Sequence, residues 1–429
     1  MAALALAEYV NAELAAETQS LSWLHDLRTQ AQQSLQAHGL PAEGSENWRY
    51  SSLRSLLRKP LSVSTDVIVD EQQLLSLVAL EKNDFRMVFV NGLYQAQLSL
   101  VPVDIQISSL ATELKQQNLS AYFTPLPEAV DAGFSWLNAS RFEDGLYIKL
   151  EDNQVVEQTI HLIQLSVGDV LSHGRHIIDL GADSSLSLNE HFVDLSGVAA
   201  GGLLNTQMHI LVGKNARMDW TRTQALGSKS MLVDRVDCQL SKGAQLHCTH
   251  LDVGGLWIRH DFNVELQGEH GFIQVDGVVL VRGRQHTDFH TRIDHQVENC
   301  TSRENFKCIA DGRGRGVYNG KILVQPGADG SDSAQKSANL LLSPHAEIDT
   351  KPDLEILADD VIASHGATVG QLDEDALYYL RTRGIDVPLG RKMLMRAFCQ
   401  EVIDRVKAPV AREQLAGKLD QVFTQMEIT

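Results

Sequence analysis

The sequence has few cysteines, and none of them forms a recognisable redox or metal-binding motif. Its 429 residues contain no CxxC pair. The five cysteines are Cys238, Cys248, Cys300, Cys308 and Cys399. An odd and widely spaced set argues against a disulfide framework and for a reducing, cytoplasmic location.

Long apolar runs and a basic leader are also missing. No apolar stretch approaches the roughly 20 residues of a membrane span. The first Lys or Arg is Arg28, and Glu8 and Glu13 interrupt the apolar N-terminus, so we expect an amphipathic first helix there and no signal peptide. Lys and Arg number 37 against 55 Asp and Glu, a formal charge of -18. This charge repels phosphate backbones and anionic lipid, so we expect neither nucleic-acid nor membrane binding.

Common catalytic motifs are absent as well. The sequence has no GxSxG and no HExxH. The glycine-rich run 312–316, GRGRG, lacks the GK[ST] ending of a P-loop and opens no helix, so we interpret it as a turn. We therefore expect a protein that is not an enzyme. Acidic residues are plentiful, and they leave a β-solenoid enzyme such as a carbohydrate lyase open as the alternative.

The pattern of apolar and polar residues divides the chain into three regions. Residues 1–138 mix helix and strand signals, residues 139–370 alternate apolar and polar residues in short runs, and residues 371–429 are helical. A chain of this length is too long for one compact core. The elements that we expect are a helix at 17–37, a strand and turn at 86–94, a connector with a short helix at 121–138, and helices at 373–383, 389–407 and 410–426.

A loose repeat runs through the middle region. A small residue, any residue, an apolar residue, a polar residue and an apolar or small residue recur at 216–220, 244–248, 271–275 and 346–350. The first three units begin 28 and 27 residues apart, which suits one coil of a β-solenoid. The competing interpretation is a β-sandwich, whose strands recur at roughly 8–12 residues.

The C-terminal helices carry recognisable end signals. Asp373 is a suitable N-cap, and the segment 373–383 has acids in its first turn and arginines in its last. Gly384 suits the position after the helix. Three short helices after a β body are typical of a docking module.

The sequence contains 16 histidines, and several gather in one stretch. They are His247, His250, His260, His270, His286, His290 and His295. A metal site is one interpretation, but no spacing among them completes a known ligand motif. We favour the other interpretation, in which they are polar positions that face outward from the coils.

His365 stands in a run of small residues, ASHGATVG (363–370). Gly366 would let the backbone turn or be approached closely. The run lies where the β body meets the helical tail, which suits a histidine that is presented to a partner or ligand. The residues leave an alternative open, in which the run is a capped strand end and the histidine simply makes its hydrogen bonds within the fold.

The segment KPDLEILADDVIASHGATVGQLDEDALYYLRTRGID (351–386) resembles the C-terminal signature of the SufB/SufD family of iron–sulfur cluster assembly proteins. SHGATVG together with Leu380 is closer to the SufD branch than to the SufB branch. Further resemblance lies at 39–53, through Pro41, Glu46, Trp48 and Tyr50, at 86–94, and at 315–343, through Gln335 and Asn339.

The resemblance implies a right-handed parallel β-helix between an N-terminal α/β region and a C-terminal helical domain. It implies a SufBCD complex, in which SufB pairs with this chain through the last coils and two copies of the ATPase SufC dock on the helices. A transient iron–sulfur cluster would form at the SufB–SufD interface and pass to apo-proteins, with none bound permanently. Whether the isolated chain is a homodimer stays open.

The resemblance also assigns roles to particular residues. His365 matches the histidine that contributes to the nascent iron–sulfur cluster. Gln335 and Asn339 match the coils at the SufB or self-pairing edge, and the SufC-docking region corresponds to Tyr378, Tyr379, Arg381 and Arg383. Ala363 departs from the pattern, because relatives often have a cysteine there, and so this chain lacks that thiolate.

Overall fold

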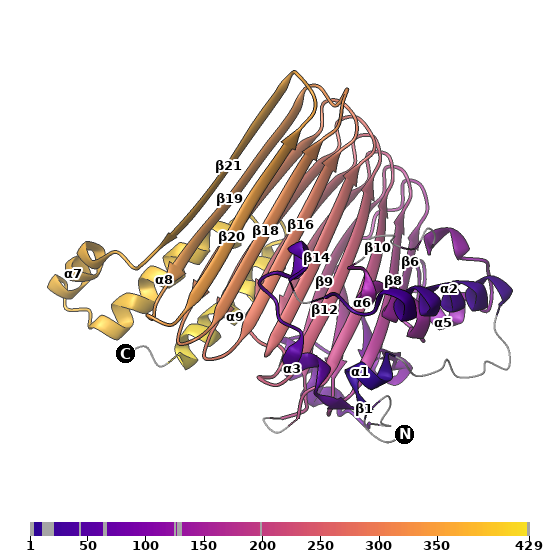
Figure 1. Ribbon diagram of the computed structural model, residues 1–429, viewed down its shortest axis with the longest axis horizontal. Helices are drawn as coiled ribbons and strands as arrows, with labels where there is room; N and C mark the ends of the chain where they lie inside the picture. Colours follow the sequence, from indigo (N-terminus) through magenta and orange to yellow (C-terminus); the bar gives the residue numbers. More distant parts are fainter. Residues whose placement is uncertain are drawn as a thin grey trace.

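The fold was analysed in a computed structural model that describes residues 4–10, 21–42, 44–62, 67–123, 126, 131–197 and 200–426. It is a mainly β protein in which a parallel β-helix stands between an N-terminal α/β region and C-terminal helices (Figure 1). This is the fold class that the sequence predicts. Within the described residues, no helix is long and apolar enough to cross a membrane.

Two sheets form the β-helix, and the chain alternates between them. We call one of them the even-numbered sheet, because all of its strands except β5 have even numbers. In the described residues it has nine strands in the order β20-β18-β16-β14-β12-β10-β8-β6-β5. These are β5 (Gln106–Ser109), β6 (Leu146–Leu150), β8 (Leu171–Leu180), β10 (Leu203–Val212), β12 (Met231–Leu240), β14 (Trp257–Leu266), β16 (His286–His295), β18 (Arg315–Val324) and β20 (Glu347–Ile356).

The other is the odd-numbered sheet, in which all strands except β4 have odd numbers. Over the same described part it has ten strands in the order β21-β19-β17-β15-β13-β11-β9-β7-β3-β4. These are β3 (Arg86–Val90), β4 (Leu93–Tyr94), β7 (Ile160–Ser166), β9 (Ser185–Asp194), β11 (Arg217–Gln224), β13 (Gln245–Asp252), β15 (Phe272–Val281), β17 (Thr301–Ala310), β19 (Ser331–Leu341) and β21 (Val361–Gly370). A separate short sheet pairs β1 (Leu4–Ala5) with β2 (Pro60–Leu61).

The coils stack in parallel and in register, which excludes the β-sandwich. The first three predicted repeat units lie one above another, since Arg217 pairs with Gln245 and Gln245 with Phe272. The fourth unit opens β20 and therefore belongs to the other sheet. Alternate residues point inward and form the continuous core of the solenoid. The run 312–316 makes the predicted turn, with Gly312 at φ 66°, and then enters β18.

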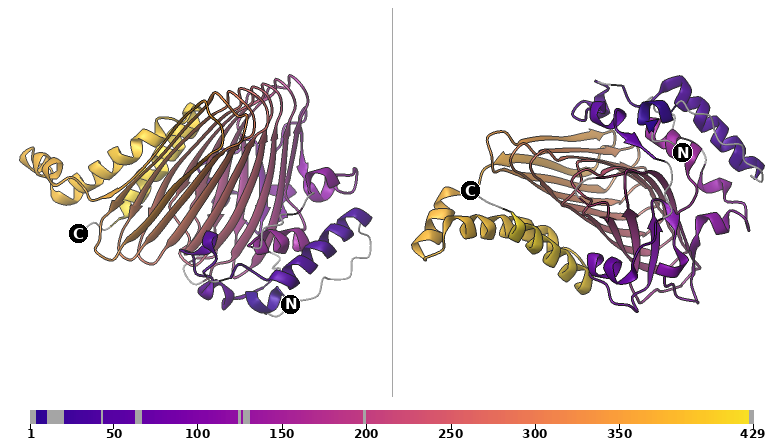
Figure 2. Two further views of the ribbon diagram at one scale, coloured as in Figure 1. Left: turned by 45° about the horizontal axis from the view of Figure 1, so that its top comes forward. Right: turned by 90° about the horizontal axis from the view of Figure 1, so that it is seen from below.

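N-terminal elements cover the outer face of the even-numbered sheet (Figure 2). Trp48 stacks on Trp257 of β14, and Phe134 stacks on Trp48. The helices are α1 (Leu6–Tyr9), α2 (Ser22–His38), α3 (Arg54–Leu57), α4 (Glu71–Val78), α5 (Leu110–Glu113) and α6 (Gly133–Arg141), with 3-10 turns at Glu46–Trp48, Ala96–Leu98 and Ser120–Tyr122. Helix α4 lies against the odd-numbered sheet.

The predicted N-terminal elements are found with shifted bounds. The strand and turn at 86–94 are confirmed, with Asn91 and Gly92 at φ 49° and 82° between β3 and β4. The predicted helix at 17–37 is α2, whose expected first turn falls at 17–20, outside the described residues. The expected amphipathic first helix is described only as α1, since 11–20 lie outside those residues too.

The three predicted C-terminal helices are confirmed as α7 (Glu374–Thr382), α8 (Val387–Ile403) and α9 (Pro409–Gln425). Asp373 is the predicted N-cap, because its side chain accepts hydrogen bonds from the backbone N–H groups of Asp375 and Ala376. Helices α8 and α9 pack on the outer face of the odd-numbered sheet. Two ion pairs add to this contact, Lys307–Glu401 at 2.7 Å and Arg405–Asp276 at 3.0 Å.

Two glycines offer a matched test of interior packing. A Cβ at Gly277 would lie 2.5 Å from two ring carbons of Phe306, whereas a Cβ at Gly366 would meet no heavy atom within 4 Å. We expect Gly277→Ala to lower the free energy of unfolding by about 1–3 kcal/mol, because overpacking displaces the ring. Gly366→Ala should leave it unchanged or raise it slightly. Denaturant unfolding followed by circular dichroism measures both, and equal effects would contradict the packing described.

Candidate functional site

The β-helix is open at its C-terminal end. Strands β20 and β21 are the last strands of their sheets, and among the described residues each pairs with a strand on one side only (Figure 1). Such an edge presents unpaired backbone N–H and C=O groups to another chain. The end is therefore a surface to which further strands can be added.

His365 lies on β21 and occupies an inward-facing row of the solenoid. The row follows the register pairs of the odd-numbered sheet: Leu188, Trp220, Cys248, Val275, Glu304, Gln335 and His365. Every earlier member is buried, while His365 is exposed because no coil follows it. The run 363–370 is continuous strand, so Gly366 makes no turn, and no described residue approaches it closely, since a Cβ there would meet no heavy atom within 4 Å.

The inward-facing row that contains His365 becomes polar in the last coils. Glu304 is 3% exposed, accepts a hydrogen bond from Gln335 Nε2 at 2.7 Å and accepts another from the Tyr318 hydroxyl at 3.3 Å. Burial raises the pKa of Glu304 to about 6, although these hydrogen bonds favour its charged form. The positions in register with Glu304 in the earlier coils are Leu188, Trp220, Cys248 and Val275, so this row becomes polar only towards the open end.

Several buried polar atoms near this end have no hydrogen-bond partner among the described residues. They are Ser333 Oγ, Gln335 Oε1, Asn339 Oδ1 and Thr350 Oγ1. A buried polar atom without a partner costs about 1–3 kcal/mol, so native proteins retain few of them without a reason. Their position next to an open end is consistent with a surface that is completed by something else.

The structure places Gln335 and Asn339 one strand in from the edge. Both are on β19 and buried, with 3% exposure each, and β21 lies between them and the end of the sheet. Asn339 donates to the backbone carbonyl of Thr368 on β21 at 2.9 Å. Asn339 therefore holds the edge strand β21 through a hydrogen bond. The role of both residues in pairing with SufB or with a second copy of the chain stays a prediction.

This chain offers no thiolate at the open end. All five cysteines lie in the described residues, and each is a free, buried thiol. Burial raises the pKa of Cys308 and of Cys399 to about 12. Cys308 is on β17, in register with Asn339 and Val369, four residues along the strand from the His365 row. Ala363 faces inward beside Ser333, where the resemblance leads one to look for a cysteine.

Of the predicted docking residues, Tyr378, Tyr379 and Arg381 lie on α7 and Arg383 is its C-cap, and α7 projects away from the solenoid (Figure 1). Tyr378 and Tyr379 are 67% and 56% exposed, and the Arg383 guanidinium lies over the Tyr379 ring at 5.2 Å. Leu389 and Met393 of α8 are exposed as well. These side chains give the C-terminal helices an apolar surface that nothing in the described chain covers.

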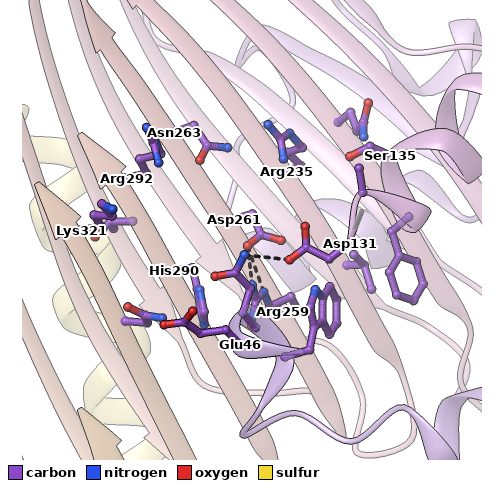
Figure 3. A pocket seen from close by; sticks show the side chains of 18 of the residues that line it. Glu46, Asp131, Ser135, Arg235, Arg259, Asp261, Asn263, His290, Arg292 and Lys321 are labelled. Atoms are coloured by element: carbon purple, nitrogen blue, oxygen red, sulfur yellow. Dashed lines mark hydrogen bonds and ion pairs between the residues drawn. The ribbon is translucent and has the colours of Figure 1, made fainter. Parts of the chain in front are cut away.

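A polar groove of about 440 Å³ lies between the N-terminal segment and the outer face of the even-numbered sheet (Figure 3). Its charges are largely paired with one another. Arg259 bonds Asp261 and Asp288 at 2.6 Å each, and Lys351 bonds Glu46 at 3.0 Å. The Lys351–Glu46 pair attaches the N-terminal segment to the coils, as does a hydrogen bond from Arg259 Nη1 to the Asn47 carbonyl at 3.0 Å. Sequence analysis missed the groove, because its lining comes from segments more than 200 residues apart.

The histidine cluster is divided between the two faces of the coils. As predicted, His247, His286 and His290 lie at outward positions of their strands and His270 is exposed in a turn. His250, His260 and His295 are instead buried within the solenoid, so for these three the expectation is wrong. They bond to interior groups instead: His250 to Cys248 at 3.4 Å, and His295 to Ser302 at 2.9 Å. In the described parts of the chain, no group of three or more His, Cys, Asp or Glu side chains could hold a metal ion.

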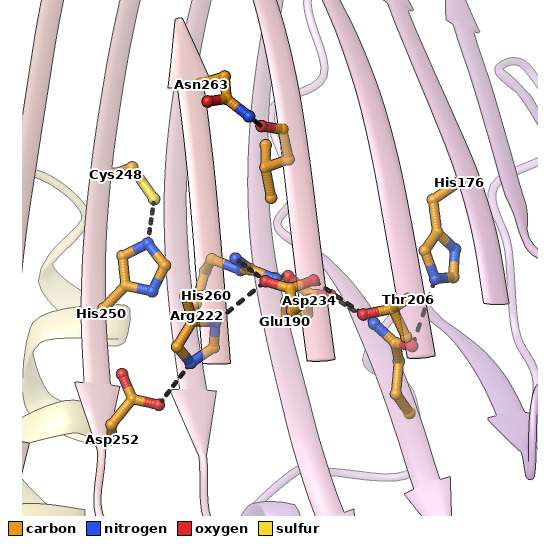
Figure 4. Close-up of polar contacts among 12 residues, drawn as sticks. His176, Glu190, Thr206, Arg222, Asp234, Cys248, His250, Asp252, His260 and Asn263 are labelled. Atoms are coloured by element: carbon orange, nitrogen blue, oxygen red, sulfur yellow. Dashed lines mark hydrogen bonds and ion pairs between the residues drawn. The ribbon is translucent and has the colours of Figure 1, made fainter. Parts of the chain in front are cut away.

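A chain of charges crosses the solenoid interior at His260 (Figure 4). His260 lies between Asp234 and Asp252, with 3.0 Å to each, and Arg222 bridges Asp234 and Glu190 at 2.8 and 2.6 Å. Burial opposes the charged imidazole, but the two aspartates outweigh it and raise the pKa of His260 to about 9. His260 is therefore a cation at neutral pH, and the network holds the middle coils together by paired charges.

Comparison with known families agrees with this architecture. Residues 163–398 match the model described as "SUF system FeS cluster assembly, SufBD core domain", and residues 6–162 match "SufBD protein N-terminal region". The chain belongs to the SufBD family of iron–sulfur cluster assembly proteins. The SufBD core match contains the open end and His365, and the N-terminal match contains the segment that borders the groove.

Two similar proteins align over most of the chain and a third over about half of it. It is 29% identical to the iron-sulfur cluster assembly protein SufD of Escherichia coli over 399 residues, 91% of this chain and 92% of that one. It is 28% identical to a SufBD family protein of Synechocystis over 89% of this chain and 86% of the relative. Protein ABCI7, chloroplastic, of Arabidopsis thaliana is 30% identical over 49% of this chain and 44% of the relative.

The interior charge network predicts a pH dependence of stability. The folded pKa of His260 lies above its ordinary value of roughly 6.5, so its stabilising contribution is complete below that value and is lost as the pH rises through about 9. We expect the melting temperature of the wild type to fall between about pH 7 and pH 10, and His260→Gln to remove part of this fall.

His295→Gln is the matched control for this measurement. His295 is also buried, but burial lowers its pKa to about 4, so it is neutral throughout that range. Its variant should keep the wild-type pH dependence. An unchanged slope in His260→Gln would show that the imidazole is neutral in the fold.

Proposed function

We propose that this chain is the SufD-type scaffold subunit of a cytoplasmic SufBCD complex, in which it pairs with SufB and docks the ATPase SufC. The nascent iron–sulfur cluster forms at the SufB–SufD interface and is then passed to apo-proteins. The observation that carries the proposal is the position of His365, at the exposed end of an inward-facing row between two unpaired sheet edges. The free thiols support a reducing compartment.

The chemistry of the open end suits a shared site. Iron accepts imidazole and thiolate ligands, and a neutral imidazole is available near pH 7. This chain supplies the imidazole of His365, while its own thiols are buried and held protonated. The thiolate must therefore come from the partner. A histidine also binds the cluster less permanently than a thiolate, which suits a scaffold that releases its cargo.

The charge of β20 supports a partner of different sequence over a second copy of this chain. Its outer face carries Glu347, Asp349, Asp353 and Glu355 around a single Lys351. Arg315 of β18 bonds Glu347 and Asp349 at 3.1 and 2.9 Å on one side, while the other side of the strand is open. Antiparallel self-pairing centred on Lys351 would set these acids opposite one another, which destabilises a sheet.

The connection between α7 and β21 gives the ATPase a route to the site. Only residues 371–373 separate the end of β21 from the start of α7. A nucleotide-driven movement of SufC that displaced α7 would act directly on the strand that carries His365. Since β21 is held by one neighbouring strand, a small shift of this edge would open or close the interface.

We expect His365→Ala to abolish cluster formation without preventing assembly. The chain is co-expressed with SufB and SufC homologues, the complex is reconstituted anaerobically, and iron, sulfide and visible absorbance are measured per complex. Ser364→Ala is the matched control, because Ser364 is the preceding residue on the opposite face of β21. A His365→Ala complex that loads clusters like the wild type would remove His365 from the site, and failure of the wild type to assemble would contradict the complex itself.

We expect Tyr378→Ala and Tyr379→Ala to weaken SufC binding while SufB pairing persists. A buried tyrosine at an interface commonly contributes about 2 kcal/mol, a roughly thirty-fold change in Kd. Titration calorimetry of the SufB–SufD pair with SufC measures the effect. Val103→Ser, which removes a fully exposed apolar side chain that is distant in sequence, should bind normally. Unchanged affinity in both tyrosine variants would place the docking surface elsewhere.

A further inference from the structure

The side-chain amide of Gln335 has a fixed orientation. Gln335 lies in the row directly before His365, and its Nε2 donates to Glu304 Oε2 at 2.7 Å. The space for this amide exists because residue 320 is a glycine: a Cβ at Gly320 would lie 2.1 Å from Gln335 Nε2. A carboxylate only accepts hydrogen bonds, so the NH₂ group of the amide faces Glu304.

This orientation leaves the amide oxygen as the free group. Gln335 Oε1 is buried and has no hydrogen-bond partner in the described residues. The residue in register with Gln335 on the next strand is His365, and neighbouring strands lie roughly 4.8 Å apart. In-register residues of parallel strands point to the same face, so the imidazole of His365 lies on the same inward face as the Gln335 amide, in the next coil.

We propose that Gln335 is a positioning residue for His365, accepting a hydrogen bond on Oε1 from one ring N–H so that the other ring nitrogen faces the nascent cluster. The proposal rests on the proposed function and adds a residue to its site. Histidines that bind metals regularly donate their second ring N–H to an oxygen acceptor, which fixes the tautomer and the ring plane. Glu304 acts indirectly: it accepts the hydrogen bond from Nε2 and so holds the Gln335 amide with Oε1 turned away from Glu304.

Pairing of the solenoid end would make this hydrogen bond stronger. In the free chain, water competes for the exposed imidazole of His365. When a partner strand covers the end, His365 loses this competing water, and Gln335 Oε1, which is already buried without a partner among the described residues, is left as its acceptor. The histidine is thus oriented by the same assembly step that brings the partner's ligand to the site.

The test measures cluster loading of the assembled complex in a double-mutant cycle. Gln335→Met keeps the length of the side chain and removes the acceptor, and we expect it to lower the affinity for the cluster about 10- to 100-fold. In the His365→Ala background the same change should have no further effect, because the histidine that it positions is gone. Lys336→Met, the adjacent residue on the outer face of β19, is the control and should load normally.

Glu304→Gln tests the same idea without removing the acceptor. A glutamine at position 304 can donate as well as accept, so the Gln335 amide is free to turn over, and we expect a loss smaller than that of Gln335→Met. Melting curves of each variant report folding independently. Wild-type loading by Gln335→Met, or a loss that adds fully to that of His365→Ala, would overturn the proposal. Normal loading by His365→Ala itself would instead overturn the proposed function.

Discussion

Parallel, in-register stacking is the constraint on which the rest of this structure depends. Each inward-facing residue is covered by the residue at the same position in the next coil, so every row is buried except at its two ends. The N-terminal elements cover outer faces and supply strands to the first coils. The last coil has no successor, and its edge strands and inward row stay accessible. A solenoid of this kind therefore carries an association surface as a direct result of its repeat.

The distribution of polar groups in the interior follows from the same constraint. Hydrocarbon fills most inward positions, the coils around Arg222 and His260 also bury ion pairs, and the last coils bury Gln335 beside Glu304. Buried polar atoms without a partner among the described residues occur in both places, for example Arg222 Nη2 and Asp252 Oδ2 in the middle and Gln335 Oε1 near the end. Those at the open end lie where an added layer can satisfy them.

The sequence predicted the elements whose signals are local. The spacing of the units at 216, 244 and 271, the Asn91-Gly92 turn and the Asp373 cap each depend on a few neighbouring residues, and each was found in place. The facing of the histidines was not predictable, because a strand of alternating residues does not say which face is inward when both faces carry polar groups. The repeat pattern did not say which sheet a unit belongs to, since the unit at 346–350 opens a strand of the other sheet. The groove and the Glu304–Gln335 contact depend on register between coils, which no local pattern contains.

The burial of all five thiols has a consequence for oxidation. Hydrogen peroxide attacks the thiolate form of cysteine, and a thiol that is both inaccessible and protonated reacts slowly. The isolated subunit can thus meet an oxidant without forming sulfenic acid or a disulfide, and its coils keep their geometry. In a complex built around this chain, oxidative damage would fall on the cargo and on the chain that contributes the thiolate. This chain would stay unmodified by the oxidant.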